Sequence, residues 1–152
     1  MTPAAPKRFR NPVISGFNPD PSICRVGNDF YLVTSSFEYF PGVPIYHSKD
    51  LVHWRLLGHV LSRQSQLDVR KSKSSGGIYA PTLRHDGKLF YMVTTHIDGG
   101  GNFYVTAERP EGPWSEPIWL DRDGIDPSFS FIDGTAYYTR NGKGSDFDHP
   151  LI

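Results

Sequence analysis

A short proline-containing motif occurs three times in the chain, each time ahead of an apolar run that is rich in aromatic residues. This repeat limits the possible folds more than any other part of the sequence. The motif and the run that follows it occupy residues 18–33, 80–93 and 125–138. The prolines at equivalent positions, Pro21, Pro81 and Pro127, lie 60 and 46 residues apart. A period of about 40–50 residues is typical of repeat folds such as the β-propeller.

The pattern within each unit predicts four strands, out and back twice. In the first unit they are expected at residues 22–25, 30–36, 42–47 and 55–61. In the second unit they are expected at residues 79–84, 89–95, 102–107 and 117–120, and the third unit supplies residues 129–132 and 135–140. The Asp86-Gly87 and Asp133-Gly134 pairs are typical of hairpin turns. Because no helical period longer than a turn or two occurs, we predict an all-β fold.

Trp54 and Trp114 hold equivalent places in the first two units, each at the turn before the fourth strand. Two units and half of a third cannot close a ring, because propellers have about four to eight blades. We therefore expect residues 11–152 to be the N-terminal part of a propeller domain, behind a disordered lead-in at residues 1–10. Open edges on the first and third blades are expected to favour self-association.

The composition excludes several partner classes. Sixteen basic and sixteen acidic residues cancel, so no nucleic-acid or membrane partner is indicated by charge. No apolar stretch has the length of a signal peptide or a membrane span, and we expect a cytoplasmic protein. The one cysteine, Cys24, cannot form an internal disulfide and is expected to be a buried, inert thiol.

Two carboxylates, Asp20 and Asp126, take the same place in units one and three. The first strand of each blade lines the axis of a propeller, so we expect both side chains to converge on one end of the channel. Paired carboxylates are the usual groups for hydrolysing a glycosidic bond, one as acid and the other activating water. For either residue alone, an Asp-Pro turn is the alternative interpretation.

Five segments that occur in order closely resemble glycoside hydrolase family 43, in particular its β-xylosidase and α-L-arabinofuranosidase members. They read NPVISGFNPDPSI, SSFEYFPGVPIYHSKDLVHW, SGGIYAPTLR, GPWSEPIWL and GIDPSF. The resemblance implies a five-bladed β-propeller that releases sugars, with inversion, from the non-reducing end of xylo- or arabino-oligosaccharides. It also implies that Asp20 is the general base, and that Asp126 raises the pKa of the acid and orients it.

The resemblance further implies that Phe37 and Tyr79 are aromatic walls of the sugar subsite, and that Ala80 leaves room for the sugar. Many relatives carry Trp where this chain has Tyr79. Ordinary core packing is the alternative for both aromatic residues.

The proton-donating Glu of the family lies in a Glu-Gly-Pro segment in the blade after the third. Residues 111–113 have these letters but lie in the second unit, so we do not assign them that role and expect the donor beyond Ile152. We therefore expect little or no activity from this chain alone. The rivals are a non-catalytic carbohydrate-binding or interaction fragment, and a truncated product that never folds stably.

Other groups of residues give little indication of a metal or cofactor site. His47, His53 and His59 recur every six residues, which suits no usual metal site. Calcium near the axis occurs in some relatives, but no oxygen-ligand loop is visible here, and we predict no cofactor or metal. Residues 99–101 are expected to be a flexible glycine link. Residues 71–77 are expected to be a mobile loop near the rim of the pocket, with a phosphate site as the weaker alternative.

Overall fold

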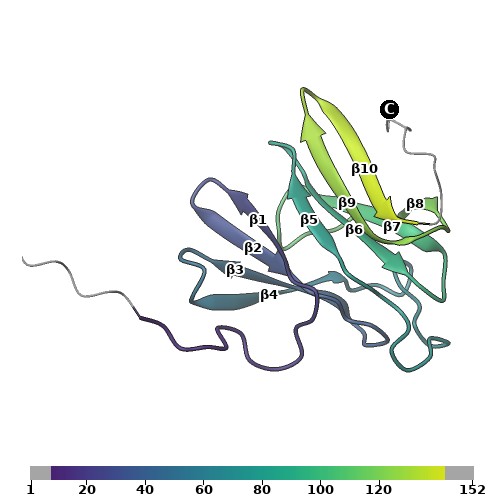
Figure 1. Ribbon diagram of the computed structural model, residues 1–152, viewed down its shortest axis with the longest axis horizontal. Helices are drawn as coiled ribbons and strands as arrows, with labels where there is room; N and C mark the ends of the chain where they lie inside the picture. Colours follow the sequence, from purple (N-terminus) through teal and green to yellow (C-terminus); the bar gives the residue numbers. More distant parts are fainter. Residues whose placement is uncertain (1–7, 143–152) are drawn as a thin grey trace, which may run out of the picture.

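The computed structural model describes residues 8–142, and these residues form ten β-strands and no helix (Figure 1). The first six strands are β1 (Ser22–Val26), β2 (Asp29–Val33), β3 (Gly42–Ser48), β4 (Trp54–Leu61), β5 (Thr82–His85) and β6 (Phe90–His96). The others are β7 (Gly101–Ala107), β8 (Ile118–Asp121), β9 (Ile125–Ile132) and β10 (Thr135–Asn141). No membrane-spanning helix is therefore found in the described part of the chain.

The strands form three antiparallel meanders, as the repeat predicts. One sheet has the order β1-β2-β3-β4, the second has β5-β6-β7-β8, and β9 pairs with β10. Short turns set the register: Val26 lies opposite Asp29 across the first hairpin, and Thr135 lies opposite Ile132 across the predicted Asp133-Gly134 turn. Each sheet is one blade, and the third is described as its first two strands.

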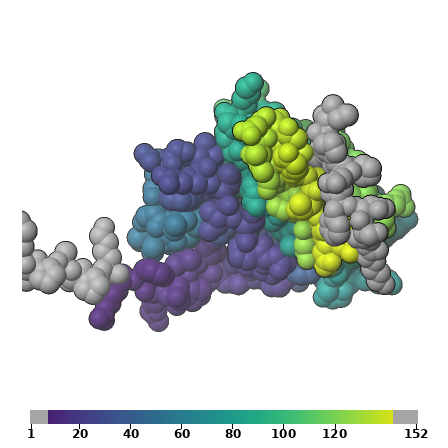
Figure 2. Space-filling model, turned by 45° about the horizontal axis from the view of Figure 1, so that its top comes forward, coloured from purple at the N-terminus to yellow at the C-terminus, as the bar shows by residue number. Residues whose placement is uncertain are grey.

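The blades pack face to face. Strand β5 contacts both β1 and β9, and β9 also contacts β6 and β7. Figure 2 shows the yellow β9–β10 hairpin lying against the teal second blade. Between the first two blades lies an apolar core that includes Val33, Ile45, Leu83, Phe103 and Trp114. Burying one such large side chain contributes about 1.5–3 kcal/mol, so packing between blades supplies much of the stability.

The two tryptophans at the blade turns play matching roles, as predicted. The indole N–H of Trp54 donates to the carbonyl of Leu51 at 3.0 Å, and that of Trp114 donates to the carbonyl of Pro110 at 3.3 Å. Each ring therefore closes the turn that leads into the outermost strand of its blade.

Two predicted strands are shorter than expected at the ends nearest the motif. The second strand ends at Val33 rather than residue 36, and the first strand of blade two begins at Thr82 rather than residue 79. Conversely, β9 begins at Ile125, ahead of the predicted residue 129. The backbone of Ser35 bonds to Pro19, and Phe37 pairs with Ile78, which also forms an isolated bridge to His96 at the end of β6.

The glycine link predicted to be flexible is a tightly packed turn. A Cβ atom at Gly99 would overlap the imidazole of His96, and one at Gly100 would overlap the indole of Trp119. Gly101 has a φ of 92° and begins β7. Glycine is needed here because backbone and rings approach too closely for any side chain.

Candidate active site

The serine of each Asp-Pro-Ser motif ties its strand to β5. The hydroxyl of Ser22 accepts a hydrogen bond from the backbone N–H of Leu83 at 3.2 Å. On the other side of β5, Arg84 donates to the hydroxyl of Ser128 at 3.2 Å and to the carbonyl of Phe129 at 3.0 Å. The innermost strands of the three blades are therefore neighbours, and the two motifs flank β5 at the same level.

A chain of hydrogen bonds brings the starts of β5 and β9 to one end of the molecule. The N–H of Tyr79 donates to the carbonyl of Thr95 at 2.9 Å, and the hydroxyl of Thr95 donates to Asn102 Oδ1 at 2.6 Å. Asn102 Nδ2 then donates to the carbonyl of Asp123, just before β9, at 2.8 Å.

The start of β1 joins the same end. The N–H of Ser35 donates to the carbonyl of Pro19 at 3.0 Å. Two residues later, the N–H of Phe37 donates to the carbonyl of Ile78 at 2.9 Å, which lies just ahead of β5. Hydrogen bonds therefore link the segment before β5 both to the strand end that holds the start of β1 and, through Thr95 and Asn102, to the residue before β9.

Asp20 and Asp126 share an uncommon backbone conformation at this end. Both residues are exposed, and each is followed by a proline. The aspartates themselves have a left-handed φ, which is 51° at Asp20 and 57° at Asp126. A non-glycine residue in such a conformation costs about 1–3 kcal/mol, and such strain is concentrated at functional sites. Ala80, at the corresponding place in blade two, has no positive φ.

The carboxylate of Asp20 is held by a neighbouring strand end. The hydroxyl of Ser35 donates to Asp20 Oδ2 at 2.6 Å. Within residues 8–142, no hydrogen bond to the carboxylate of Asp126 is seen. Of the two motif aspartates, Asp20 is therefore the one whose side chain is fixed by a described contact.

Aromatic rings form a wall that includes Phe37, two residues after the serine that holds Asp20. The ring of Phe37 lies 5.6 Å from that of Tyr79 and 5.8 Å from that of Phe17, between centroids. Phe17 in turn lies 6.0 Å from Tyr39. Phe37, Tyr79 and Ala80 are half-buried, whereas Phe17 and Tyr39 are 63% and 61% exposed.

Phe17 and Tyr39 are not among the site residues predicted from the sequence. Large aromatic residues in polar loops that contain prolines are the sequence signal that would have indicated them. The wall they extend depends on close backbone packing. Phe37 has a left-handed φ of 46°, and Gly77 has a φ of 78°. A Cβ atom at Gly77 would overlap the carbonyl of Phe37, so glycine lets the two segments meet.

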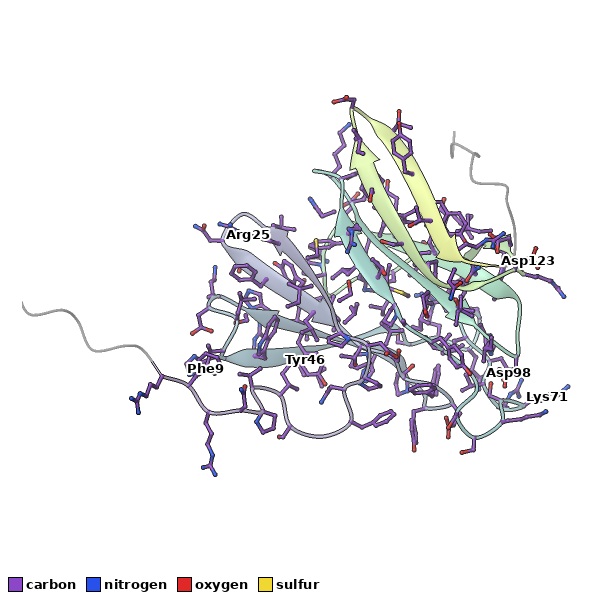
Figure 3. The ribbon with its side chains drawn as sticks, viewed as in Figure 1. Phe9, Arg25, Tyr46, Lys71, Asp98 and Asp123 are labelled. Carbon is purple, nitrogen blue, oxygen red and sulfur yellow. The ribbon has the colours of Figure 1, made fainter. Side chains whose placement is uncertain are left out.

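The loop of residues 71–77, predicted to be mobile, is tied down by the carboxylate of Asp98. That carboxylate accepts hydrogen bonds from the hydroxyl of Ser72 at 2.9 Å and from the backbone N–H groups of Lys73 at 3.0 Å and Gly77 at 3.1 Å. Figure 3 shows Asp98 and Lys71 at the same edge of the molecule. The loop also reaches the wall, because the Tyr79 hydroxyl donates to the carbonyl of Ser75 at 3.2 Å.

The electrostatics of this loop follow from its burial and its donors. Burial acts to raise the pKa of Asp98, but the hydrogen bonds from Ser72, Lys73 and Gly77 outweigh it and lower that pKa. Burial lowers the pKa of His96, although Asp98, 3.3 Å from its Nε2, acts in the opposite direction. His96 is therefore held mainly neutral beneath an ionised Asp98.

The Glu-Gly-Pro segment of residues 111–113 lies at the other end of blade two. Its turn borders a cavity of about 610 Å³ lined in part by Ala107, Gly112 and Trp114. Ala107 pairs with Phe90, the first residue of β6, whereas the site lies by His96, the last. Position therefore argues against Glu111 as the acid, in agreement with the sequence interpretation.

The histidines and the cysteine to which the sequence assigns no catalytic or metal-binding role make ordinary structural contacts. His47 contacts Asp29 and His53 contacts Asp50, and no group of three or more possible metal ligands occurs among residues 8–142. Cys24 is buried, and burial raises the pKa of its thiol. A protonated, enclosed thiol is a poor nucleophile.

Known proteins resemble this chain along nearly its whole length. The family model of Glycosyl hydrolases family 43 matches residues 9–151. The chain belongs to this family.

Two curated relatives illustrate the family 43 match. A non-reducing end alpha-L-arabinofuranosidase of Bacteroides ovatus is 59% identical over 138 residues, which are 88% of this chain and 26% of the relative. A beta-xylosidase of Bacillus subtilis is 49% identical over 138 residues, which are 86% of this chain and 26% of the relative. The chain thus spans about a quarter of the length of the curated relatives it matches.

Solved structures agree with the fold. GH43B of Bacteroides ovatus has a TM-score of 0.84 at 57% identity, covering 88% of this chain and 27% of that one. A xylan beta-1,4-xylosidase from Bacillus halodurans has a TM-score of 0.81 at 47% identity, covering 86% of this chain and 27% of that one. The prediction of an all-β chain with about two and a half blades of the family propeller is confirmed.

Proposed function

We propose that this chain carries the base-bearing part of the active site of an inverting, exo-acting glycosidase for β-xylosides or α-L-arabinofuranosides. The observation that carries the proposal is the set of hydrogen bonds that links the starts of β1, β5 and β9, together with the matching left-handed conformations of Asp20 and Asp126. Family 43 membership and the names of the relatives support it.

In this proposal Asp20 accepts a proton from water while the water oxygen attacks the anomeric carbon. The bond from that carbon to the glycosidic oxygen breaks, and the leaving oxygen takes a proton from a carboxylic acid on the opposite side of the sugar. Asp126 raises the pKa of that acid and orients it. We assign no residue of the 152 as the acid.

Phe37 and Tyr79 bind the apolar face of the sugar ring, and Ala80 leaves space beside it. Their half-buried positions support this role, because a ring that is packed on one side still presents another surface to a ligand. The relatives include enzymes named for each of the two pentoses, which supports a pentoside of xylan-derived oligosaccharides as the proposed substrate class.

The test uses two substrates that differ in their need for an acid. General acid assistance contributes about 10²–10⁴-fold, and a 2,4-dinitrophenolate leaves without it. We expect slow hydrolysis of 2,4-dinitrophenyl β-D-xyloside, releasing the α-anomer by NMR, and none of xylobiose. Asp20→Asn should abolish the turnover.

Activity that survives Asp20→Asn would contradict the assignment of the base. Xylose binding in a calorimetric titration, with no turnover of either substrate, would favour a non-catalytic carbohydrate-binding chain instead. Turnover of xylobiose at the rate of a complete family 43 enzyme would show that the acid lies within these residues.

We also propose that the chain self-associates through a blade edge. Among the described residues β10 pairs only with β9, and Tyr137 on β10 is 47% exposed. Unpaired strand edges are templates for pairing with another chain. Sedimentation velocity should show mass rising with concentration, and an unchanged monomer at all concentrations would contradict this.

A further inference from the structure

The position of Ser35 singles it out beside the base. Ser35 follows β2 and is 1% exposed, and its backbone N–H donates to the carbonyl of Pro19, the residue before Asp20. Its backbone is therefore fixed to the motif itself. Its hydroxyl, 2.6 Å from Asp20 Oδ2, holds the carboxylate from the buried side.

This bond limits what the carboxylate of Asp20 can do. Asp20 is exposed, so a carboxylate without a partner would be free to rotate about its side-chain bonds. With Oδ2 occupied by the short hydroxyl contact, Oδ1 is left to accept the proton of the attacking water. Hydrogen bonds from a neutral donor to a carboxylate are among the stronger ones in proteins.

The neighbouring hydroxyls make the role of Ser35 specific. Thr34 and Ser36 are also buried, 0% and 5% exposed, but neither hydroxyl has a hydrogen-bond partner within residues 8–142. Of three consecutive buried hydroxyls, only the middle one engages the motif. Polar burial alone therefore does not explain the contact.

We propose that Ser35 is the positioning residue of the base: its hydroxyl fixes Asp20 Oδ2 so that Oδ1 faces the attacking water. This inference rests on the proposed function, in which Asp20 is the base. Ser35 itself touches no reacting atom, and it acts only through Asp20.

The experiment compares Ser35→Ala with Ser36→Ala in the full chain, because both remove one buried hydroxyl from adjacent positions. On 2,4-dinitrophenyl β-D-xyloside, Ser35→Ala should lower kcat by about 10- to 100-fold with KM changed by less than about twofold. Ser36→Ala should leave both constants near the wild-type values. Ser35→Thr, which keeps the hydroxyl, should recover most of kcat if its thermal melt matches the wild type.

A second readout does not depend on turnover. The ¹³Cγ resonance of Asp20, assigned through Asp20→Asn, should move in Ser35→Ala and stay in place in Ser36→Ala. If the wild type shows no turnover that depends on Asp20, the proposed function fails, while this resonance still reports on the contact. Equal loss of kcat in the two alanine variants, or an Asp20 resonance that ignores Ser35→Ala, would overturn the role of Ser35.

Discussion

At the scale of single residues, the site combines strained aspartates with glycines that permit close approach. Asp20, Phe37 and Asp126 all have left-handed φ values, of 51°, 46° and 57°. Only tertiary contacts can hold non-glycine residues there, because the conformation is unfavourable locally. The sequence shows the Asp-Pro pairs, but not this conformation, since prolines normally bias the preceding residue toward extended backbone.

Gly77→Ala should destabilise the wall through a clash and not only through its backbone angle. Gly77 and Gly134 have φ values of 78° and 79°, but a Cβ atom would overlap Phe37 at the first and meet nothing at the second. We expect Gly134→Ala to cost about 1–2 kcal/mol of unfolding free energy. Gly77→Ala should cost about 1–3 kcal/mol more, from overpacking.

Urea denaturation of both variants measures this difference. Because Gly77 supports Phe37, its variant should also bind xylose more weakly, while Gly134→Ala should bind it as the wild type does. Equal destabilisation by the two substitutions would show that the segments at Phe37 and Gly77 do not meet as described.

His96 should make folding stability depend on pH below neutrality. Burial lowers its pKa from 6.5 in the folded chain, so below pH 6.5 the unfolded chain binds a proton that the folded chain does not. Stability should therefore fall as the pH drops from 6.5 toward the folded pKa, by at most about 1.4 kcal/mol per pH unit.

The measurement is the unfolding free energy between pH 5 and 7 for the wild type and His96→Gln. The wild type should lose more stability than the variant over this range, and subtracting the two removes the contribution of other groups such as His59. A steeper loss in His96→Gln would contradict a neutral His96 in the folded chain.

At the scale of elements, the loop of residues 71–77 is positioned by one carboxylate from another turn. Asp98→Ala should release this loop, because Ser72, Lys73 and Gly77 all lose their acceptor. Trypsin should then cut faster after Arg70, Lys71 and Lys73, as measured by mass spectrometry of the fragments. Glu108→Ala, which removes an exposed carboxylate elsewhere, should leave the cleavage rate unchanged, and equal rates in both variants would contradict the tether.

The elements themselves were largely predictable from local patterns. Apolar runs in a repeated order and turn residues such as the Asp-Gly pairs predicted all ten strands, because apolar runs and turn chemistry are short-range signals. The errors lie where long-range contacts decide. Phe37 leaves its ladder to pair with Ile78 of the second blade, and residues 99–101 pack against His96 and Trp119, none of which is visible in the local sequence.

The site was predictable to a similar degree. Repeat register identified Asp20 and Asp126, and the family resemblance supplied Phe37, Tyr79 and Ala80. Nothing in the sequence indicated Ser35. Three consecutive residues, Thr34, Ser35 and Ser36, carry hydroxyls, and only the structure shows which of them contacts Asp20. Phe17 joins the wall only because residues 8–21, which contain no strand, lead back to the start of β1.

At the scale of the whole molecule, polar bonds join blades that are otherwise held by apolar packing. Asn102, fully buried at the start of β7, accepts from Thr95 and donates to Asp121 and to the carbonyl of Asp123. The carboxylate of Asp121 also pairs with Arg140 on β10 at 3.1 Å. This network connects blade two to the start and the return strand of blade three.

Asn102→Ala should therefore loosen the third blade before the first two. It leaves the buried hydroxyl of Thr95 without its acceptor and removes one donor from the Asp121 carboxylate and from the Asp123 carbonyl, which we expect to cost about 2–4 kcal/mol. In hydrogen–deuterium exchange, amides of β9 and β10 should exchange faster, while those of β1–β4 keep wild-type rates near neutral pH. Asn28→Ala, at an exposed turn of blade one, is the matched control and should change neither set. Uniform acceleration across all three blades would instead mean that the chain opens only as a single cooperative unit, with no separate weakness at the Asn102 network.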